Sequence, residues 1–243
     1  MAVLSGIHPV AEALRAKRPL DRILVARGLG GARIQEVIDL ARQAGTPVRF
    51  EERAALDRLA ATGAHQGVIA LGAAKKYADL DEVAPASDLI VVLDGVEDPH
   101  NLGAIIRTAH AAGAGAVVIA ERRAAGLTDV VAKAAAGALE YVPIVRAGNL
   151  NQVLRSLKDM GYFVYGLDER GPVAYDQAVW NQKTVIVMGA EGKGLHELVR
   201  KNCDVLLSIP MAGKIASLNV SVATGVVLFS RLSRYRTAEA ELG

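Results

Sequence analysis

Short runs of aliphatic residues alternate with helical segments through the second part of the chain, and this alternation constrains the fold most. The first run, Leu89–Leu93, is aliphatic throughout, as expected for a strand buried on both faces of a sheet. Strands that alternate with helices indicate a parallel sheet covered by helices. We therefore predict an α/β fold for residues 88–243. The predicted strands are 89–93, 116–120, 142–145, 162–167, 184–188 and 205–209, and the predicted helices are 102–112, 130–139, 150–160, 195–201 and 218–236.

The pattern of apolar residues in the first 73 residues predicts a second, smaller α/β unit. Apolar residues at helical spacing alternate with short apolar runs. The predicted helices are 7–17, 34–44 and 54–61, and the predicted strands are 22–26, 48–50 and 67–71. Residues 74–87 lack sustained periodicity and contain Pro85, which favours a linker. The sequence thus predicts two domains, 1–73 and 88–243, joined by residues 74–87.

Composition supports this organisation and says little about partners. Hydrophobic residues make up 51% of the 243 residues and aromatic residues only 4%, which suits a buried sheet covered by alanine-rich helices. The net charge is +2, and residues 1–73 hold ten Lys and Arg against seven Asp and Glu. This small basic excess is compatible with phosphate contact in the first domain and equally with an ordinary solvated surface.

Several classes of protein are disfavoured. Cys203 is the only cysteine, so a disulfide within the chain and a cysteine-based metal site are excluded, and the five histidines show no metal-ligand spacing. The chain has no apolar run of about eighteen residues and no apolar signal segment at its start. We therefore expect a soluble cytoplasmic protein that uses no metal and has no contact with membranes.

The first of three informative loops runs from Asp94 to Gly103, directly after a predicted strand. Asn101 is placed to cap the helix that follows, because its side chain can accept a hydrogen bond from a free amide. Arg107 comes six residues later, away from the apolar face of that helix. A capped helix with a solvated arginine is the simpler interpretation of this loop alone.

The second and third loops follow later strands. The second loop is Met188-Gly189-Ala190-Glu191-Gly192-Lys193-Gly194. Its glycines permit close approach of the backbone to a ligand, and Glu191 has no evident structural role. In Ile209–Asn219 a strand ends, and Ser217 or Asn219 begins a helix whose free amides suit a polar ligand. A glycine-rich turn and an ordinary helix cap are the alternatives. Gly28–Arg33 partly matches a dinucleotide fingerprint, but Arg33 occupies the third glycine position, so a plain loop is expected.

Together and in this order, the loops resemble the signature motifs of the SpoU/TrmH family of RNA methyltransferases. The stretches are DPHNLGAIIRTAHAAG, VIVMGAEGKGL and IPMAGKIASLNVSVATGVVLF, and the resemblance covers residues 89–234. Residues 5–71, from SGIHPVAEAL to GAHQGVIAL, resemble the L7Ae/L30e-like substrate-binding domain found in one branch. That branch, the RlmB type, methylates a guanosine of 23S ribosomal RNA.

The resemblance implies a SpoU-type catalytic domain knotted as a deep trefoil, an L30e-like RNA-binding domain before it, and a homodimer with the active site at the subunit interface. Such a knot departs from the rule that chains do not thread loops. S-adenosylmethionine is the implied cofactor, held by the backbone of Gly189, Ile209 and Leu218 with Met188 and Ser217 beside it. At the reacting end, the matching polar residues are Asn101, Arg107, Glu191 and Asn219.

The implied reaction is methyl transfer to a ribose 2′-hydroxyl of RNA, as part of ribosomal RNA processing. It needs neither a metal nor a covalent intermediate, so correct positioning is expected to dominate, with a value of up to roughly 7–11 kcal/mol. Guanidinium groups are poor bases at neutral pH. Arg107 is therefore expected to orient the hydroxyl and a nearby phosphate, and it could be the base only in surroundings that favour the neutral form. Glu191 and Asn219 would fix Arg107 and the cofactor.

Three alternatives remain open from sequence. One is a transfer RNA or resistance-type ribosomal RNA methyltransferase with the same catalytic domain. Another is a non-catalytic RNA-binding factor of ribosome assembly. The third is a nucleotide-binding enzyme that uses the Gly28 loop, and its glycine spacing is poor.

Overall fold

The computed structural model describes residues 2–60, 64–214 and 217–242, and its contacts divide the chain into two compact units. The first unit comprises residues 1–76 together with 126–141, and the second comprises 77–125 together with 142–243. Residues 126–141 thus pack with the first unit, although the sequence placed them inside the second predicted domain. Neither local periodicity nor composition signals this assignment, because it depends on contacts between distant parts of the chain.

A four-stranded sheet forms the centre of the first unit. Its order is β1-β4-β2-β3, with β2 and β3 parallel and the other neighbours antiparallel. The strands are β1 (Ala2–Ser5), β2 (Leu20–Ala26), β3 (Val48–Glu51) and β4 (Val68–Gly72), and the helices are α1 (Ile7–Arg15), α2 (Ala32–Gln43) and α3 (Arg53–Leu59). Strand β1 was not predicted, and it is defined by its antiparallel pairing with β4, which is distant in sequence. Residues Gly28–Arg33 include the loop before α2, and α2 begins at Ala32.

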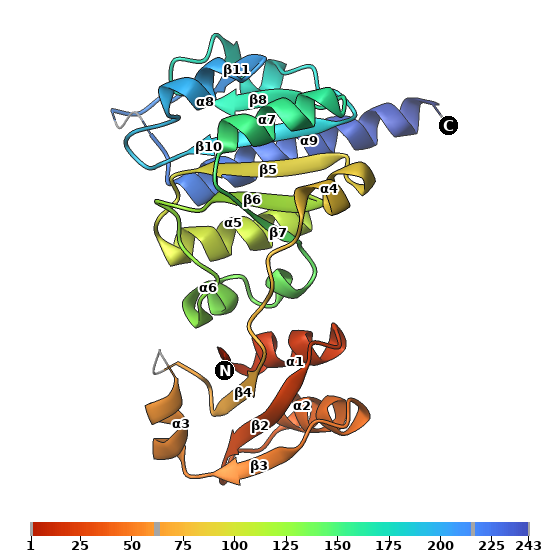
Figure 1. Ribbon diagram of the computed structural model, residues 1–243, viewed down its shortest axis with the longest axis vertical. Coiled ribbons are helices and arrows are strands. Elements are labelled where there is room, and N and C mark those ends of the chain that lie inside the picture. Colours follow the sequence, from red (N-terminus) through yellow and green to blue (C-terminus); the bar gives the residue numbers. More distant parts are fainter. Residues whose placement is uncertain (1, 61–63, 215–216, 243) are drawn as a thin grey trace. The chain divides into compact units, whose positions relative to one another are not determined.

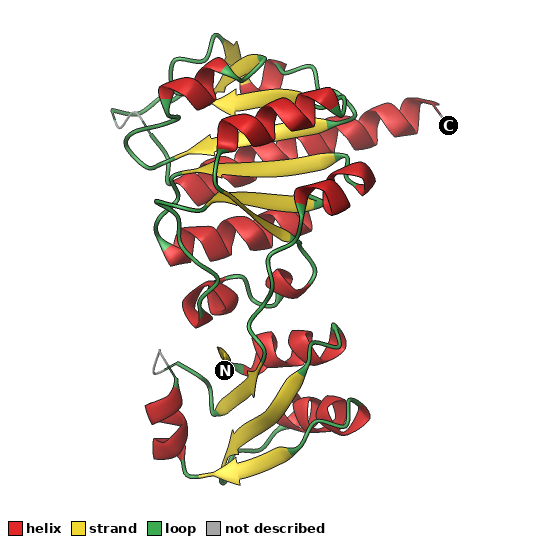
Figure 2. Cartoon of the chain, in the orientation of Figure 1, coloured by secondary structure: helices red, strands yellow, loops and turns green. Residues whose placement is uncertain are grey.

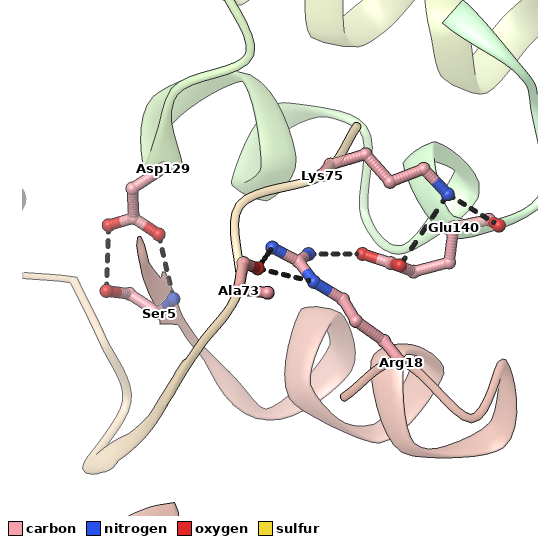
Figure 3. A network of polar contacts seen from close by, with 6 residues as sticks. All are labelled: Ser5, Arg18, Ala73, Lys75, Asp129 and Glu140. Atoms are coloured by element: carbon pink, nitrogen blue, oxygen red, sulfur yellow. Dashed lines mark hydrogen bonds and ion pairs between the residues drawn. The ribbon is translucent and has the colours of Figure 1, made fainter. Parts of the chain in front are cut away.

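Residues 126–141 join the first unit through a polar network (Figure 3). Helix α6 (Asp129–Ala134) begins this segment, and both carboxylate oxygens of Asp129 accept 2.8 Å hydrogen bonds from Ser5, one from its amide and one from its hydroxyl. After the short helix η2 (Ala138–Glu140), Glu140 pairs with Arg18 at 2.8 Å and with Lys75 at 3.8 Å. The predicted helix 130–139 ends early because Ala136 and Gly137 both have positive φ.

The second unit contains a seven-stranded sheet in the order β7-β6-β5-β10-β8-β11-β9, and every pair of neighbours is parallel. This confirms the predicted α/β class with a mostly parallel sheet. The strands are β5 (Leu89–Asp94), β6 (Ala116–Ala120), β7 (Ile144–Ala147), β8 (Phe163–Leu167), β9 (Val173–Ala174), β10 (Thr184–Gly189) and β11 (Val205–Ser208). Strand β9 has only two residues and was not predicted.

Helices cover both faces of this sheet (Figures 1 and 2). On one face, Leu150, Leu154 and Leu157 of α7 (Leu150–Asp159) pack with Val199 of α8 (Glu197–Lys201) against alternate residues of the central strands. On the other face, α5 (Pro99–Ala111) packs against α9 (Val220–Leu242). The helices are α4 (Leu80–Val83), η1 (Ala84–Ala86), α5 (Pro99–Ala111), α7 (Leu150–Asp159), η3 (Tyr175–Gln177), α8 (Glu197–Lys201) and α9 (Val220–Leu242). Helices α4 and η1 lie where the linker was predicted.

The central strands explain where polar chemistry can occur. All six residues of β5 are buried, as are the first five of β10, so these strands can carry no solvent-exposed group along their length. Gly189 pairs with Asp94 at the carboxyl ends of β10 and β5. Because parallel strands end on the same edge, the loops after them meet there. Across the helices within the described ranges, none is long and apolar enough to span a membrane.

Candidate active site

A cavity of about 350 Å³ lies in the second unit, at the carboxyl edge of the sheet. Its wall combines the loop after β8, the loop after β10 and the segment that leads into α9. All five residues predicted to bind the cofactor line it: Met188, Gly189, Ile209, Ser217 and Leu218. These five residues are up to thirty positions apart in sequence, and the fold brings them together around one cavity.

The conformation of the loop after β10 requires a glycine at position 189, because the backbone of Gly194 and Leu195 lies directly against it. A Cβ on Gly189 would lie 2.2 Å from the carbonyl carbon of Gly194 and 2.5 Å from the amide nitrogen of Leu195. Ala190 and Gly194 exchange backbone hydrogen bonds of 3.0 and 3.1 Å, and Gly192 and Gly194 have φ of +71° and +64°. The loop is therefore a tight turn that leaves Glu191 and Lys193 exposed at its tip.

A buried carboxylate holds the far end of this loop. Asp94, the last residue of β5, accepts a 2.8 Å hydrogen bond from the amide of His196 and lies 2.8 Å from its Nδ1 atom. The Asp94 carboxylate thus ties β5 to the segment that enters α8. Sequence reasoning placed Asp94 only at the start of the first loop, although an acidic residue at the end of an otherwise aliphatic run is an available signal.

Three of the four predicted catalytic residues meet in one hydrogen-bonded cluster. The Nδ2 atom of Asn219 donates to Oδ1 of Asn101 at 2.9 Å and to Oε1 of Glu191 at 2.6 Å. The same Glu191 oxygen accepts a 3.4 Å hydrogen bond from the amide of Val220. Asn101 comes from the first turn of α5, Glu191 from the loop after β10 and Asn219 from the segment that leads into α9. Glu191 also lines the cavity.

Asn101 does not cap α5, which corrects the local prediction. The helix begins two residues earlier, at Pro99, and Asp98 caps it by accepting a 2.7 Å hydrogen bond from the amide of His100. Proline suits the first helical position because its missing N–H would be unpaired there. Asn101 consequently lies in the first turn, buried, with its side chain free to contact Asn219.

Arg107 lies apart from this cluster. Its side chain is exposed, does not line the cavity, and forms no hydrogen bond or ion pair with the described residues. Six residues of α-helix turn through about 240° beyond one full turn and rise about 9 Å, so Arg107 and Asn101 lie on different faces of α5. A single chain thus brings together Asn101, Glu191 and Asn219 but not Arg107.

The cavity also has a charged wall that the sequence analysis missed. Asp168, Glu169 and Arg170 follow β8 and line the cavity together with Arg200. Asp168 accepts a 2.9 Å hydrogen bond from the amide of Arg170 and lies 3.8 Å from Nε of Arg200. The available signal was a polar run directly after a buried strand of a parallel sheet, where ligands commonly bind.

The lining fits a small polar cofactor. A volume of about 350 Å³ is within the roughly 300–1,000 Å³ typical of small-molecule sites. Met188, Ile209 and Leu218 supply apolar contact, while exposed backbone and charged side chains supply polar contact. Among the residues that the structure describes, no group of three or more His, Cys, Asp or Glu side chains could hold a metal ion.

Comparisons with known proteins agree with this geometry. Residues 88–229 match the model of the SpoU rRNA Methylase family, and residues 3–78 match the model named RNA 2′-O ribose methyltransferase substrate binding. A putative TrmH family tRNA/rRNA methyltransferase, YacO of Bacillus subtilis, is 41% identical over 230 residues, which is 92% of each chain. A putative TrmH family tRNA/rRNA methyltransferase of Staphylococcus aureus is 39% identical and covers 93% of this chain and 94% of its own.

Solved structures give the same result. The SpoU methyltransferase AviRb of Streptomyces viridochromogenes, in complex with AdoMet, has a TM-score of 0.83 at 26% identity and covers 97% of this chain and 90% of its own. An AdoMet-bound rRNA methyltransferase of Sinorhizobium meliloti has a TM-score of 0.81 at 27% identity, with coverage of 96% and 87%.

Fold, cavity and family models together define an RNA-modifying enzyme of the α/β class. The chain belongs to the SpoU/TrmH family of RNA methyltransferases, whose cofactor is S-adenosylmethionine. The family, the enzyme class and the cofactor predicted from the three loops are confirmed.

Proposed function

We propose that the chain transfers a methyl group from S-adenosylmethionine to a ribose 2′-hydroxyl of RNA, and that the acceptor is a guanosine of 23S ribosomal RNA. The observation that carries the proposal is the cluster of Asn101, Glu191 and Asn219 beside a cavity of cofactor size. The match of residues 3–78 to a substrate-binding model of ribose methyltransferases supports the choice of acceptor atom. Since the proposed substrates are RNAs, we also propose a cytoplasmic location.

The proposed cofactor contacts use the backbone of the loops. Gly189, Ile209 and Leu218 would hold S-adenosylmethionine through main-chain groups, with Met188 and Ser217 beside them. When bound, the cofactor supplies an electrophilic methyl group on its sulfonium. The chain's own task is to hold the ribose hydroxyl in line with that methyl group and to keep other nucleophiles away, since positioning provides most of the rate in such a reaction.

The polar cluster is proposed to position the ribose. Glu191 fixes the Asn219 amide by accepting a hydrogen bond from it, and Asn219 in turn orients Asn101. Arg107 would orient the 2′-hydroxyl and an adjacent phosphate, because a guanidinium is a strong donor in such pairs and a poor proton acceptor. The hydroxyl proton would pass to solvent or to a neighbouring oxygen of the RNA as the new bond forms.

We propose that the enzyme is a homodimer in which Arg107 of the partner subunit completes each site. Within one chain Arg107 lies on a different face of α5 from Asn101, so it cannot act beside the cluster there. On α9, which packs against α5, Val222 and Phe229 are 52% and 47% exposed. They are seven residues apart and therefore share one helical face, which a second copy would bury.

Mixing two inactive variants tests this arrangement. Arg107→Ala and Glu191→Gln subunits are unfolded together, refolded and assayed for methyl transfer. If Arg107 acts across a two-fold interface, half of the dimers are mixed and each has one intact site, so about a quarter of wild-type activity returns. If Arg107 acts within its own chain, no mixed dimer has an intact site and activity stays at the level of the separate variants.

The finer architecture is part of the proposal. We propose that residues 88–243 form the catalytic domain, knotted as a deep trefoil, and that residues 74–87 join it to an L30e-like RNA-binding domain, residues 1–73. Within the catalytic range, residues 126–141 pack with the first unit. The knot is supported by family membership and by the shared cavity of the loop after β10 and the start of α9. The RNA-binding role is supported by the match over residues 3–78.

Mapping 2′-O-methyl groups in ribosomal and transfer RNA, with and without the gene, tests the substrate. Loss of one methyl group from a guanosine of 23S ribosomal RNA is the expected result. Loss at a transfer RNA position instead would reassign the substrate, and no change would favour a non-catalytic binding factor. Calorimetry measures whether the protein binds S-adenosylmethionine. Absence of binding would identify a non-catalytic factor, which has no need of the cofactor.

A further inference from the structure

The loop between β6 and residue 126 contains two arginines, Arg122 and Arg123, with no acidic partner among the residues that the structure describes. Arg122 and Arg123 are both exposed, and neither forms an ion pair or hydrogen bond with the described residues. The nearest acidic residue in sequence, Glu121, lies 3.9 Å from Arg146 instead. Asp98 on the neighbouring loop is engaged in capping α5. Exposed guanidinium groups without an acidic partner attract anions.

The backbone of this loop is strained at one of the two arginines. Arg123 has φ of 56°, in the left-handed region that glycine and asparagine adopt far more readily than arginine. A glycine or asparagine here would make the same turn at lower conformational cost. Strained backbone of this kind is concentrated at functional sites, and an observed outlier is a legitimate starting point for a functional hypothesis.

The loop is nevertheless held firmly at both ends. The amide of Glu121 donates a 2.8 Å hydrogen bond to the carbonyl of Ala147, at the end of β7. The amide of Ala125 donates a 3.0 Å hydrogen bond to the carbonyl of Val96, in the loop after β5. The two arginines thus lie on a short segment that is fixed on one side to the loop between β5 and α5, and the first turn of α5 contains Asn101.

Sheet register places this segment beside the proposed active site. Strand β5 lies between β10 and β6 (Figure 1), and its last residue, Asp94, pairs with Gly189 of β10. Leu93 pairs with Ile119 of β6, directly before the loop. Two spacings of about 4.8 Å separate β10 from β6, so the arginine loop begins about 10 Å from the cavity, along the edge where the polar cluster lies.

We propose that Arg122 and Arg123 bind a phosphate of the RNA chain next to the methylated nucleotide, and so hold the acceptor ribose over the Asn101–Glu191–Asn219 cluster. This inference rests on the proposed function, and it adds where the RNA backbone next to the acceptor nucleotide is bound. Arginine suits the task because its planar group can donate two parallel hydrogen bonds to one phosphate. Phosphate contacts of this kind set the register of a nucleic acid without reading its sequence.

The test compares wild type with Arg122→Gln/Arg123→Gln, using ribosomal RNA from cells that lack the gene as the probe. We expect KM for RNA to rise about tenfold or more, while kcat and the affinity for S-adenosylmethionine stay within about twofold. The dependence of log K on log salt should also become shallower by roughly 0.7 to 0.9, since the loss of one phosphate contact removes about that much from the slope. Arg155→Gln is the matched control, because Arg155 is exposed on α7 and also has no ion-pair partner among the described residues.

A second variant separates RNA binding from a structural role. Arg123→Asn removes the charge and relieves the left-handed backbone, so its melting temperature should equal or exceed that of wild type while its RNA affinity falls. A lower melting temperature would assign Arg123 a structural role and overturn the proposal. So would an unchanged KM and salt dependence in the double variant, or an equal loss in Arg155→Gln.

These outcomes remain distinct from failure of the proposed function. If wild-type enzyme neither binds S-adenosylmethionine nor methylates the RNA, the proposed function fails. If wild type is active and the double variant is indistinguishable from it, only the phosphate site fails.

Discussion

Asn219 serves two structural duties with one side chain. Its Oδ1 atom accepts hydrogen bonds from the amides of Ser221 and Val222, at 2.9 and 3.4 Å, and so caps α9. Its Nδ2 atom donates to Asn101 and Glu191. Because the cap fixes which end of the amide is the oxygen, the donor end must face the two residues of the proposed site. Both the simple interpretation as a helix cap and the functional interpretation are therefore correct in part.

The substitution Asn219→Asp should separate these duties. The introduced carboxylate would keep an oxygen for the cap, but it would lose the donor and place a second negative charge beside Glu191. We expect a folded protein whose kcat is lower by about tenfold to a hundredfold, as loss of a hydrogen bond to a charged group costs about 1.5–3 kcal/mol. Steady-state kinetics and circular dichroism check this. Wild-type kcat in the folded variant would remove Asn219 from the proposed machinery.

Cys203 should be an unreactive thiol in the folded protein. Burial raises the pKa of its thiol to about 12, from an ordinary value of 9.0. The thiolate is the reactive species, so a disulfide reagent at pH 8 should label native protein far more slowly than protein in denaturant. Because the folded pKa is the higher one, the stability from the protonated thiol is complete below pH 9.0 and is lost as the pH rises toward 12. Equal labelling rates would contradict the burial.

At the scale of elements, the loop after β10 depends on backbone contact rather than on side chains. Gly189 lies directly against Gly194 and Leu195, and Asp94 fixes the residue that follows. Gly189, Gly194 and Leu195 line the cavity, and Glu191 lies at its edge. Any change that pushes the two sides of this loop apart should therefore affect cofactor binding and the polar cluster together.

Gly189→Ala is the direct test of this contact. The added carbon would meet backbone atoms at 2.2 Å, and backbone cannot move aside as a flexible side chain can. We expect a loss of about 1–3 kcal/mol in the free energy of unfolding, typical of overpacking, and at least tenfold weaker binding of S-adenosylmethionine. Chemical denaturation and calorimetry measure the two effects. Gly30→Ala is the control, since nothing lies within 4 Å of its added carbon.

At the scale of the whole molecule, the two units are interleaved in sequence. Residues 126–141 follow β6 of the second unit, yet they belong to the first. Glu140 holds them there with a side chain only 4% exposed, paired with Arg18 and Lys75. Burial lowers the pKa of the Lys75 ammonium, and the charge of Glu140 opposes that shift. A fragment that begins at residue 74 would leave 126–141 without β1 and α1, its partners in the first unit.

Glu140→Gln should accordingly destabilise the first unit. The amide that replaces the carboxylate can still accept a hydrogen bond, but it removes the negative charge that compensates Arg18 and Lys75 in a nearly buried site, at a cost of about 3 kcal/mol. Hydrogen exchange should accelerate together in residues 1–76 and 126–141, and remain unchanged in β5 and β10. Glu197→Gln, which breaks an exposed pair with Lys201, should have an effect of less than about 1 kcal/mol. Faster exchange confined to 126–141 would show that the unit does not unfold cooperatively.

The amino-acid sequence by itself determined the class of the fold, the positions of most elements and the family. These follow from local patterns: short aliphatic runs such as Leu89–Leu93, alternating with helical segments, indicate buried strands, and each of the three loops is recognisable from its own residues. Only the tertiary structure decided that Asp98 rather than Asn101 caps α5, that Asp94 secures the second loop, and that Arg107 is separated from the cluster. It also assigned residues 126–141 to the first unit. The physical reason is that helix caps, the partners of buried carboxylates and packing partners depend on contacts between residues that are distant in sequence. Local periodicity contains no information about those contacts.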